Sequence, residues 1–163
     1  MIDATDAKAR EVLAACERRG WMIATVESCT GGLVAAALTE IPGSSSVVER
    51  GFVTYSNAAK AELVNVPTAL IDAHGAVSPE VAKAMAEGGL ARSRANIAVA
   101  ITGIAGPGGS DHKPEGLVCF HAVSATGESE ARRHEFGPQG RARVRSLSVM
   151  EALDLALLVA ETP

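Results

Sequence analysis

Aromatic residues are scarce in this sequence, which holds one Trp, one Tyr and three Phe among 163 residues. So few aromatic rings leave no platform on which the bases of a single-stranded nucleic acid could stack. The core must instead be built from Ala, Val, Leu and Ile. Because hydrophobic residues still make up 47% of the chain, we expect a globular protein with a sizeable core and a single domain over residues 1–163.

An excess of positive charge is also missing, since the formal net charge is -4. Nucleic-acid binding usually requires a basic surface, so we expect no nucleic-acid partner. No apolar run reaches the roughly 18 residues that a membrane span needs. The first residues are polar and charged, unlike a signal peptide. These features predict a cytoplasmic protein without a membrane partner.

The sequence has only three cysteines, Cys16, Cys29 and Cys119, and no two of them form a CxxC motif. Free thiols in a reducing compartment are the simplest interpretation. No cluster of Cys and His has the spacing of metal ligands, so we expect no metal site.

Apolar periodicity predicts alternating helices and strands. Continuously apolar strands indicate a sheet that is covered on both faces. We therefore expect an α/β three-layer sandwich, with a mixed, mostly parallel sheet and helices on both faces. The mixed character follows from an expected hairpin around Thr126 and Gly127. Helices are expected at 4–20, 31–41, 57–66, 78–94 and 141–160, and strands at 21–26, 46–56, 96–102, 116–124 and 129–136.

Three of the expected strands end in polar or glycine-rich sequence: "ESCTGG", "TYSN" and "TGIAGPGG". In α/β sheets, ligands gather where strands end and loops or helices begin. If these ends lie together, they form a pocket that holds Ser28, Thr30, Tyr55, Thr102 and many backbone amides.

Ser28 lies in the first of these turns, where three roles are open. It could cap a helix that begins near Thr30, help to cradle a phosphate, or act as a nucleophile beside unpaired helix amides that stabilise an oxyanion. Gly31 and Gly32 would let a substrate approach the backbone closely. Cys29 is a rival nucleophile in the same turn.

A serine nucleophile needs a base, and the histidines of the sequence form no catalytic pattern. Lys60 follows the strand that ends at Tyr55 and falls in the first turn of a helix that we expect Asn57 to cap. A helix N-terminus and partial burial both lower the pKa of a lysine, which would make Lys60 available as a base. Taken alone, a solvated surface lysine fits the sequence at least as well.

Arginines open the last helix in "RARVR". Arg141 and Arg145 are four residues apart and therefore share a helix face. Paired arginines suit a phosphate, although a solvated face has the same pattern.

Five segments together, "ESCTGG", "GFVTYSNAAK", "GAVSPEVA", "ITGIAGPGG" and "GLVCF", resemble the C-terminal domain of the CinA family. That domain also occurs alone as a bacterial nicotinamide-nucleotide amidase. The resemblance runs from about residue 8 to residue 160. It implies a serine–lysine hydrolase that converts nicotinamide mononucleotide to nicotinate mononucleotide and ammonia, with no cofactor. Carried over by position, it gives the nucleophile Ser28, the base Lys60 and, beside them in the catalytic group, Tyr55. The substrate-binding positions are Thr30, Gly31, Gly32, Thr102, Gly106, Gly108, Arg141 and Arg145. We expect Arg145, with Arg141 as the alternative, to neutralise the 5′-phosphate.

Two other functions stay open: a nucleotide-binding module without chemistry, and a regulatory domain linked to competence or DNA damage. A pure binding module needs no base, so Ser28 together with Lys60 favours the enzyme. We expect a pyridine nucleotide as the small-molecule partner and a homo-oligomeric assembly.

Overall fold

A five-stranded sheet runs through the middle of the protein, in the order β2-β1-β3-β4-β5. The computed structural model describes residues 3–110 and 112–163; the first two residues of the expected domain and Asp111 of the glycine-rich loop lie outside that description. The strands are β1 Ile23–Glu27, β2 Val48–Val53, β3 Ile97–Gly103, β4 Leu117–Ser124 and β5 Ser129–Glu135, and the helices are α1 Ala4–Arg18, α2 Leu33–Thr39, a short 3₁₀ turn at Ser44–Ser46, α3 Asn57–Val64, α4 Thr68–His74, α5 Pro79–Ala91 and α6 Arg141–Glu161.

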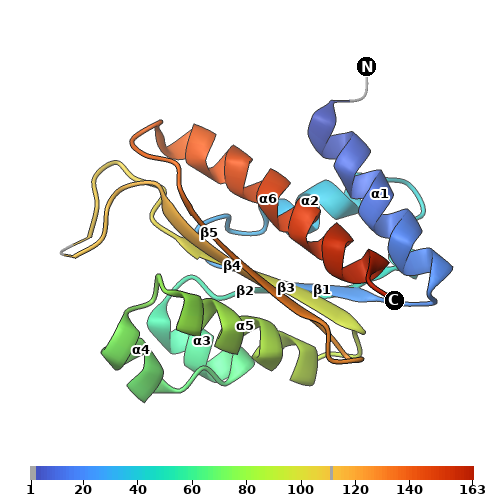
Figure 1. Ribbon diagram of the computed structural model, residues 1–163, viewed down its shortest axis with the longest axis horizontal. Helices are drawn as coiled ribbons and strands as arrows, with labels where there is room; N and C mark the ends of the chain where they lie inside the picture. The colour runs from blue at the N-terminus through green and yellow to red at the C-terminus, as the bar shows by residue number, and fades with distance from the viewer. Residues whose placement is uncertain (1–2, 111) are drawn as a thin grey trace.

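The helices cover both faces of the sheet, with α1, α2 and α6 on one side and α3, α4 and α5 on the other (Figure 1). Strands β2, β1 and β3 run parallel to one another. Strands β4 and β5 are antiparallel to their neighbours, as the hairpin in the sequence predicts. The predicted three-layer α/β sandwich with a mixed sheet is therefore confirmed.

Several helix starts differ from the expectation. Helix α3 is capped by Ser56, whose hydroxyl accepts a hydrogen bond from the Ala59 amide, so the prediction that Asn57 caps it is wrong by one residue. Helix α2 begins at Leu33 instead of Gly31, because Gly32 precedes it in a left-handed conformation with a φ of 109°. The sequence reading missed α4, which lacks a side-chain cap at its preceding residue, Pro67.

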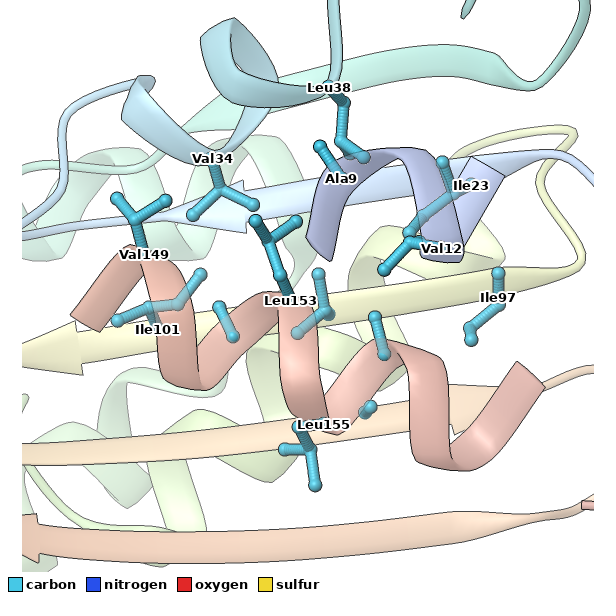
Figure 2. Close-up of a cluster of buried hydrophobic side chains, with 14 of the residues drawn as sticks. Ala9, Val12, Ile23, Val34, Leu38, Ile97, Ile101, Val149, Leu153 and Leu155 are labelled. Atoms are coloured by element: carbon cyan, nitrogen blue, oxygen red, sulfur yellow. The ribbon is translucent and has the colours of Figure 1, made fainter. Parts of the chain in front are cut away.

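The larger core lies between the sheet and the helices α1, α2 and α6 (Figure 2). Side chains along a strand alternate between the two faces of a sheet, and Ile23 of β1 and Ile97 and Ile101 of β3 point to this face. Leu153 of α6 and Val12 of α1 pack onto them, and all of these side chains are fully buried. Aliphatic side chains thus supply most of this layer, as the scarcity of aromatic residues predicts, and Trp21 and Phe120 are the buried aromatic residues among them.

On the opposite face, α5 packs unusually closely against the sheet. A Cβ added at Gly89 would lie 2.3 Å from Cγ2 of Val26 in β1, and one added at Gly88 would lie 1.7 Å from the carbonyl oxygen of Val64 at the end of α3. Real Cβ atoms cannot approach so closely, so both positions need glycine. Gly88 thus lets α5 pack directly against the last residue of α3.

The three parallel strands end next to one another. Glu27, the last residue of β1, pairs with Val53 of β2 and Ile101 of β3. Two further hydrogen bonds extend the pairing past the strand ends: the Ser28 amide donates to the Ile101 carbonyl and the Thr54 amide to the Glu27 carbonyl. The turns that follow β1, β2 and β3 are thereby gathered at one edge. Within residues 3–110 and 112–163, none of the helices combines the length and apolar character needed to cross a bilayer.

Candidate active site

A cavity of about 360 Å³ opens at the edge where β1, β2 and β3 end. All three polar strand ends contribute to it, together with the first residue of α6. Its walls are Ser28, Cys29, Tyr55, Asn57, Lys60, Ala76, Val77, Thr102, Gly103, Ile104, Ala105, Gly106, Pro107, Gly108 and Arg141. This is the position at which parallel α/β sheets bind ligands.

Ser28 and Lys60 meet at the bottom of this cavity. The Lys60 Nζ atom lies 3.1 Å from Ser28 Oγ, although the two residues belong to different turns of the chain. Lys60 is 1% exposed, which is rare for a lysine. Burial lowers the pKa of its amine below the ordinary value of 10.5.

Two main-chain carbonyls complete the surroundings of the Lys60 amine. Nζ lies 2.9 Å from the Thr54 oxygen and 3.3 Å from the Tyr55 oxygen, both in the connection between β2 and α3. A neutral amine has two N–H bonds and one lone pair. When its two hydrogens are donated to the two carbonyls, the lone pair faces Ser28 Oγ. The arrangement can therefore accept the proton of the serine hydroxyl.

Glu27 organises the turn that carries Ser28, a role that the sequence reading missed. Its buried carboxylate accepts hydrogen bonds from the Thr30 hydroxyl at 2.6 Å, the Val34 amide at 2.9 Å and the Ala35 amide at 3.0 Å. Two amides at the start of α2 are thus already paired. Ser28 therefore does not cap α2, whose Val34 and Ala35 amides are bound by Glu27. That amides at the helix start hold an oxyanion stays a prediction, and these two are not available for it.

Cys29 also lies on the cavity wall, next to Ser28, but its thiol is held in the protonated form. Burial raises the pKa of its thiol to about 12, so the thiol is protonated at neutral pH. Protonated thiols are poor nucleophiles. Lys60 is hydrogen-bonded to the Ser28 hydroxyl, and this favours Ser28 over Cys29 as the reactive group.

Three of the expected substrate-binding residues belong to the turn itself and not to the cavity wall. Thr30 is fully buried and its hydroxyl is bound to Glu27. Gly31 and Gly32 have φ angles of 58° and 109°, which side chains rarely adopt. Their function visible in the structure is to shape the turn, and the structure does not bring these three residues into the cavity lining.

Thr102, Gly106 and Gly108 do line the cavity, together with Ser28. The Thr102 hydroxyl donates to the Ala76 carbonyl at 2.8 Å and so ties the end of β3 to the segment before α5. Gly106 and Gly108 have positive φ angles that fold the loop back over the cavity. The loop reaches Arg141, which donates to the Gly106 carbonyl at 2.7 Å.

The two arginines of α6 have different surroundings despite sharing a helix face. Arg141 lines the cavity and donates to the hydroxyl of Tyr55 at 3.0 Å, and Tyr55 itself is 60% exposed at the rim. Arg145 lies one turn further on, behind the Ser28 turn. Its Nε donates to the Cys29 carbonyl at 3.1 Å and its terminal nitrogen to the Thr30 carbonyl at 3.3 Å. The structure brings Arg141, and not Arg145, to the cavity.

The fold and this site define a class: three-layer α/β domains with a buried serine–lysine pair at the carboxyl edge of their parallel strands. The model of the CinA C-terminal domain matches residues 5–159, nearly the whole sequence. The chain belongs to the CinA C-terminal domain family.

Relatives and solved structures agree with this assignment. A CinA-like protein of Parasynechococcus marenigrum is 48% identical over 151 residues, which are 91% of this chain and 36% of the relative. A putative competence-damage inducible protein of Symbiobacterium thermophilum is 60% identical over 103 residues, 63% of this chain and 24% of the relative. The chain thus spans about a third or less of the length of these curated relatives.

Among solved structures, the competence/damage inducible protein CihA of Agrobacterium tumefaciens has a TM-score of 0.94 at 46% identity, with 96% of each chain covered. The competence damage-inducible protein A of Klebsiella pneumoniae has a TM-score of 0.92 at 36% identity and covers 99% of this chain and 100% of its own. The three-layer fold is therefore the fold of the family.

Proposed function

We propose that this domain is an amidase that hydrolyses the carboxamide of nicotinamide mononucleotide to nicotinate mononucleotide and ammonia. The observation that carries the proposal is the buried Lys60 amine, 3.1 Å from the Ser28 hydroxyl, at the bottom of a cavity. Burying a lysine amine costs free energy, and ionisable groups whose pKa is shifted in this way cluster at functional sites. Membership of the CinA C-terminal domain family supports the same reaction class.

Acylation is the first half of the proposed reaction. Ser28 Oγ attacks the carboxamide carbon, and the hydroxyl proton passes to Lys60 Nζ. The carbonyl oxygen becomes an oxyanion held by backbone amides. Lys60 then gives the proton to the amide nitrogen, the C–N bond breaks, ammonia leaves, and an ester links the nicotinoyl group to Ser28. A base in this role typically contributes about 10²–10⁴-fold to the rate.

Deacylation regenerates the enzyme. Water attacks the ester carbon and gives a proton to Lys60. When the C–O bond to Ser28 breaks, Lys60 returns that proton to Oγ, and nicotinate mononucleotide is released. Every proton in the cycle passes through Lys60, and the scheme requires no cofactor.

The phosphate of the substrate needs a cation at the mouth of the cavity. Arg141 is the arginine that lines the cavity, and its guanidinium is already positioned by the Gly106 carbonyl and the Tyr55 hydroxyl. A guanidinium suits phosphate through paired, charge-assisted hydrogen bonds. We therefore assign the phosphate to Arg141, with Tyr55 at the rim beside it and Thr102 on the inner wall.

The test is to follow ammonia release from nicotinamide mononucleotide by the purified protein, with Ser28→Ala as the blank. Release that depends on Ser28 supports the proposal. Saturable binding of the nucleotide without ammonia release would instead make the domain a binding module, and neither binding nor release would favour a regulatory role.

A further inference from the structure

Arg145 and Glu27 hold the Ser28 turn from opposite sides. Glu27 binds the side of the turn that leads into α2, through the Thr30 hydroxyl and the Val34 and Ala35 amides. Arg145 reaches the turn from α6 and donates to the carbonyls of Cys29 and Thr30. Two ionisable side chains, those of Glu27 and Arg145, therefore bind this segment of the chain, and neither lines the cavity.

The Arg145 contacts fix the direction of specific peptide planes. In a trans peptide, the carbonyl and the following N–H point in opposite directions. Because the Cys29 carbonyl is bound to Arg145, the Thr30 N–H must point away from Arg145. The Thr30 carbonyl accepts hydrogen bonds from Arg145 at 3.3 Å and from the Leu33 amide at 3.0 Å, and both direct the Gly31 N–H the other way. That amide donates to the Ser28 carbonyl at 3.0 Å.

This bond passes the constraint one residue further back. With the Ser28 carbonyl held by Gly31, the direction of the Cys29 N–H is fixed by the same peptide geometry. Arg145 thus fixes the direction of the Thr30 amide directly and supports that of the Cys29 amide indirectly, through the hydrogen bond from Gly31 to Ser28.

These two amides are among those left available by the described residues, as is the Gly32 amide further along the turn. The Ser28 amide donates to Ile101, and the Val34 and Ala35 amides donate to Glu27. Within the part of the chain that the structure describes, the Cys29 and Thr30 amides donate to no other residue. Donors held in place beside a nucleophile are what stabilises an oxyanion.

We infer that Arg145 is a positioning residue that orients the Cys29 and Thr30 amides as the oxyanion donors of Ser28, and that it is not the phosphate ligand. Glu27 supports the same turn by keeping the helix-start amides away from the reaction. The inference rests on the proposed acyl transfer at Ser28 and deepens it.

Arg145→Ala tests the inference with two substrates, nicotinamide mononucleotide and p-nitrophenyl acetate. The second carries no phosphate, so it reports acyl transfer to Ser28 alone once the Ser28→Ala background is subtracted. Losing one oxyanion donor typically costs about 10²–10³-fold in turnover, and misaligning donors should cost somewhat less. We expect kcat for the mononucleotide and the acetylation rate to fall about 10- to 100-fold, with KM changed less than about threefold.

Three further variants make the result specific. Arg143→Ala removes an exposed arginine from the same helix and should behave as the wild type. Arg141→Ala should act mainly by raising KM for the mononucleotide. Added guanidinium ion should restore part of the rate of Arg145→Ala, which a purely structural defect would not allow. If Arg145→Ala fails to fold in a thermal melt, Arg145→Lys, which keeps the charge but not the fork of donors, should show the same loss in smaller degree.

A rise in KM for the mononucleotide with unchanged acetylation would overturn the inference and make Arg145 a phosphate ligand. Unchanged rates with both substrates would overturn it as well. A wild-type protein that is acetylated at Ser28 but releases no ammonia refutes the proposed substrate, and the Arg145→Ala acetylation rate then decides the inference by itself. A wild-type protein inert to both compounds refutes both proposals.

Discussion

Replacing Lys60 with methionine keeps an unbranched side chain in the buried site and removes the amine that contacts Ser28. Among the described residues, Lys60 Nζ is the hydrogen-bond partner of Ser28 Oγ, and no second base stands beside it. The whole contribution of a general base, about 10²–10⁴-fold, should therefore be lost. At 1.36 kcal/mol for each factor of ten, this corresponds to a barrier higher by about 2.7–5.4 kcal/mol.

The fold should tolerate the substitution. The Thr54 and Tyr55 carbonyls lose a donor, at roughly 1–3 kcal/mol for each group left unsatisfied. Against this, methionine has no amine to desolvate, and the depressed pKa of Lys60 shows that burial of its amine is unfavourable to the charged form. Thermal melts of the variant should therefore still show one cooperative transition.

The assay is ammonia release from nicotinamide mononucleotide at several pH values. Lys83→Met, at an exposed position of α5, is the matched control and should retain wild-type turnover. Lys60→Arg keeps a positive charge but cannot lose its proton, so it should be as inactive as Lys60→Met. Near-normal turnover by a folded Lys60→Met protein, or rescue by arginine, would refute the role of Lys60 as the base.

Other predictions use the same protein. Ser28→Ala should abolish turnover, whereas Cys29→Ala should keep most of it because the raised pKa holds the Cys29 thiol protonated; the opposite pattern in the ammonia assay would make Cys29 the nucleophile. The wild-type kcat/KM should rise with pH as Lys60 loses its proton, with a midpoint below 10.5, and a profile flat up to pH 10 would contradict this. Lys60 binds fewer protons in the folded state than in the unfolded state between its lowered pKa and 10.5, so the wild type should gain stability over Lys60→Met as the pH rises through that range, measured by urea unfolding. Gly88→Ala should destabilise the protein by about 1–3 kcal/mol or more in the same unfolding assay, because its Cβ would lie 1.7 Å from the Val64 carbonyl.

The gathering of the three polar strand ends could be predicted from the sequence, because parallel strands of one sheet end at one edge. Ser28 and Lys60 are 32 residues apart, yet each directly follows such an end, and the structure brings them within hydrogen-bond distance. Their chemical roles stay predictions. The order of the strands and of the helices other than α4 was accessible for a different reason, because it depends on local periodicity.

The contacts of individual side chains could not be predicted from the sequence, because they depend on how each side chain is oriented in the fold. Ser56 and Asn57 are both good capping residues, and composition does not decide between neighbours. Glu27 is indistinguishable in the sequence from a solvated acid, because its function depends on amides seven and eight residues away. Arg141 and Arg145 share a helix face, but four residues advance a helix by about 6 Å, which is enough to separate the cavity from the back of the turn.

The hydrogen-bond acceptors around the Lys60 amine have a consequence for how the domain can evolve. Two of them are main-chain carbonyls, those of Thr54 and Tyr55, and a substitution at either position changes the side chain while leaving the carbonyl in place. Side chains at the rim can therefore be replaced, and the substrate changed, while the hydrogen-bond acceptors of the Lys60 amine are retained. A mutational library at Tyr55, which lines the cavity and is exposed at its rim, should alter selectivity far more readily than it extinguishes reactivity.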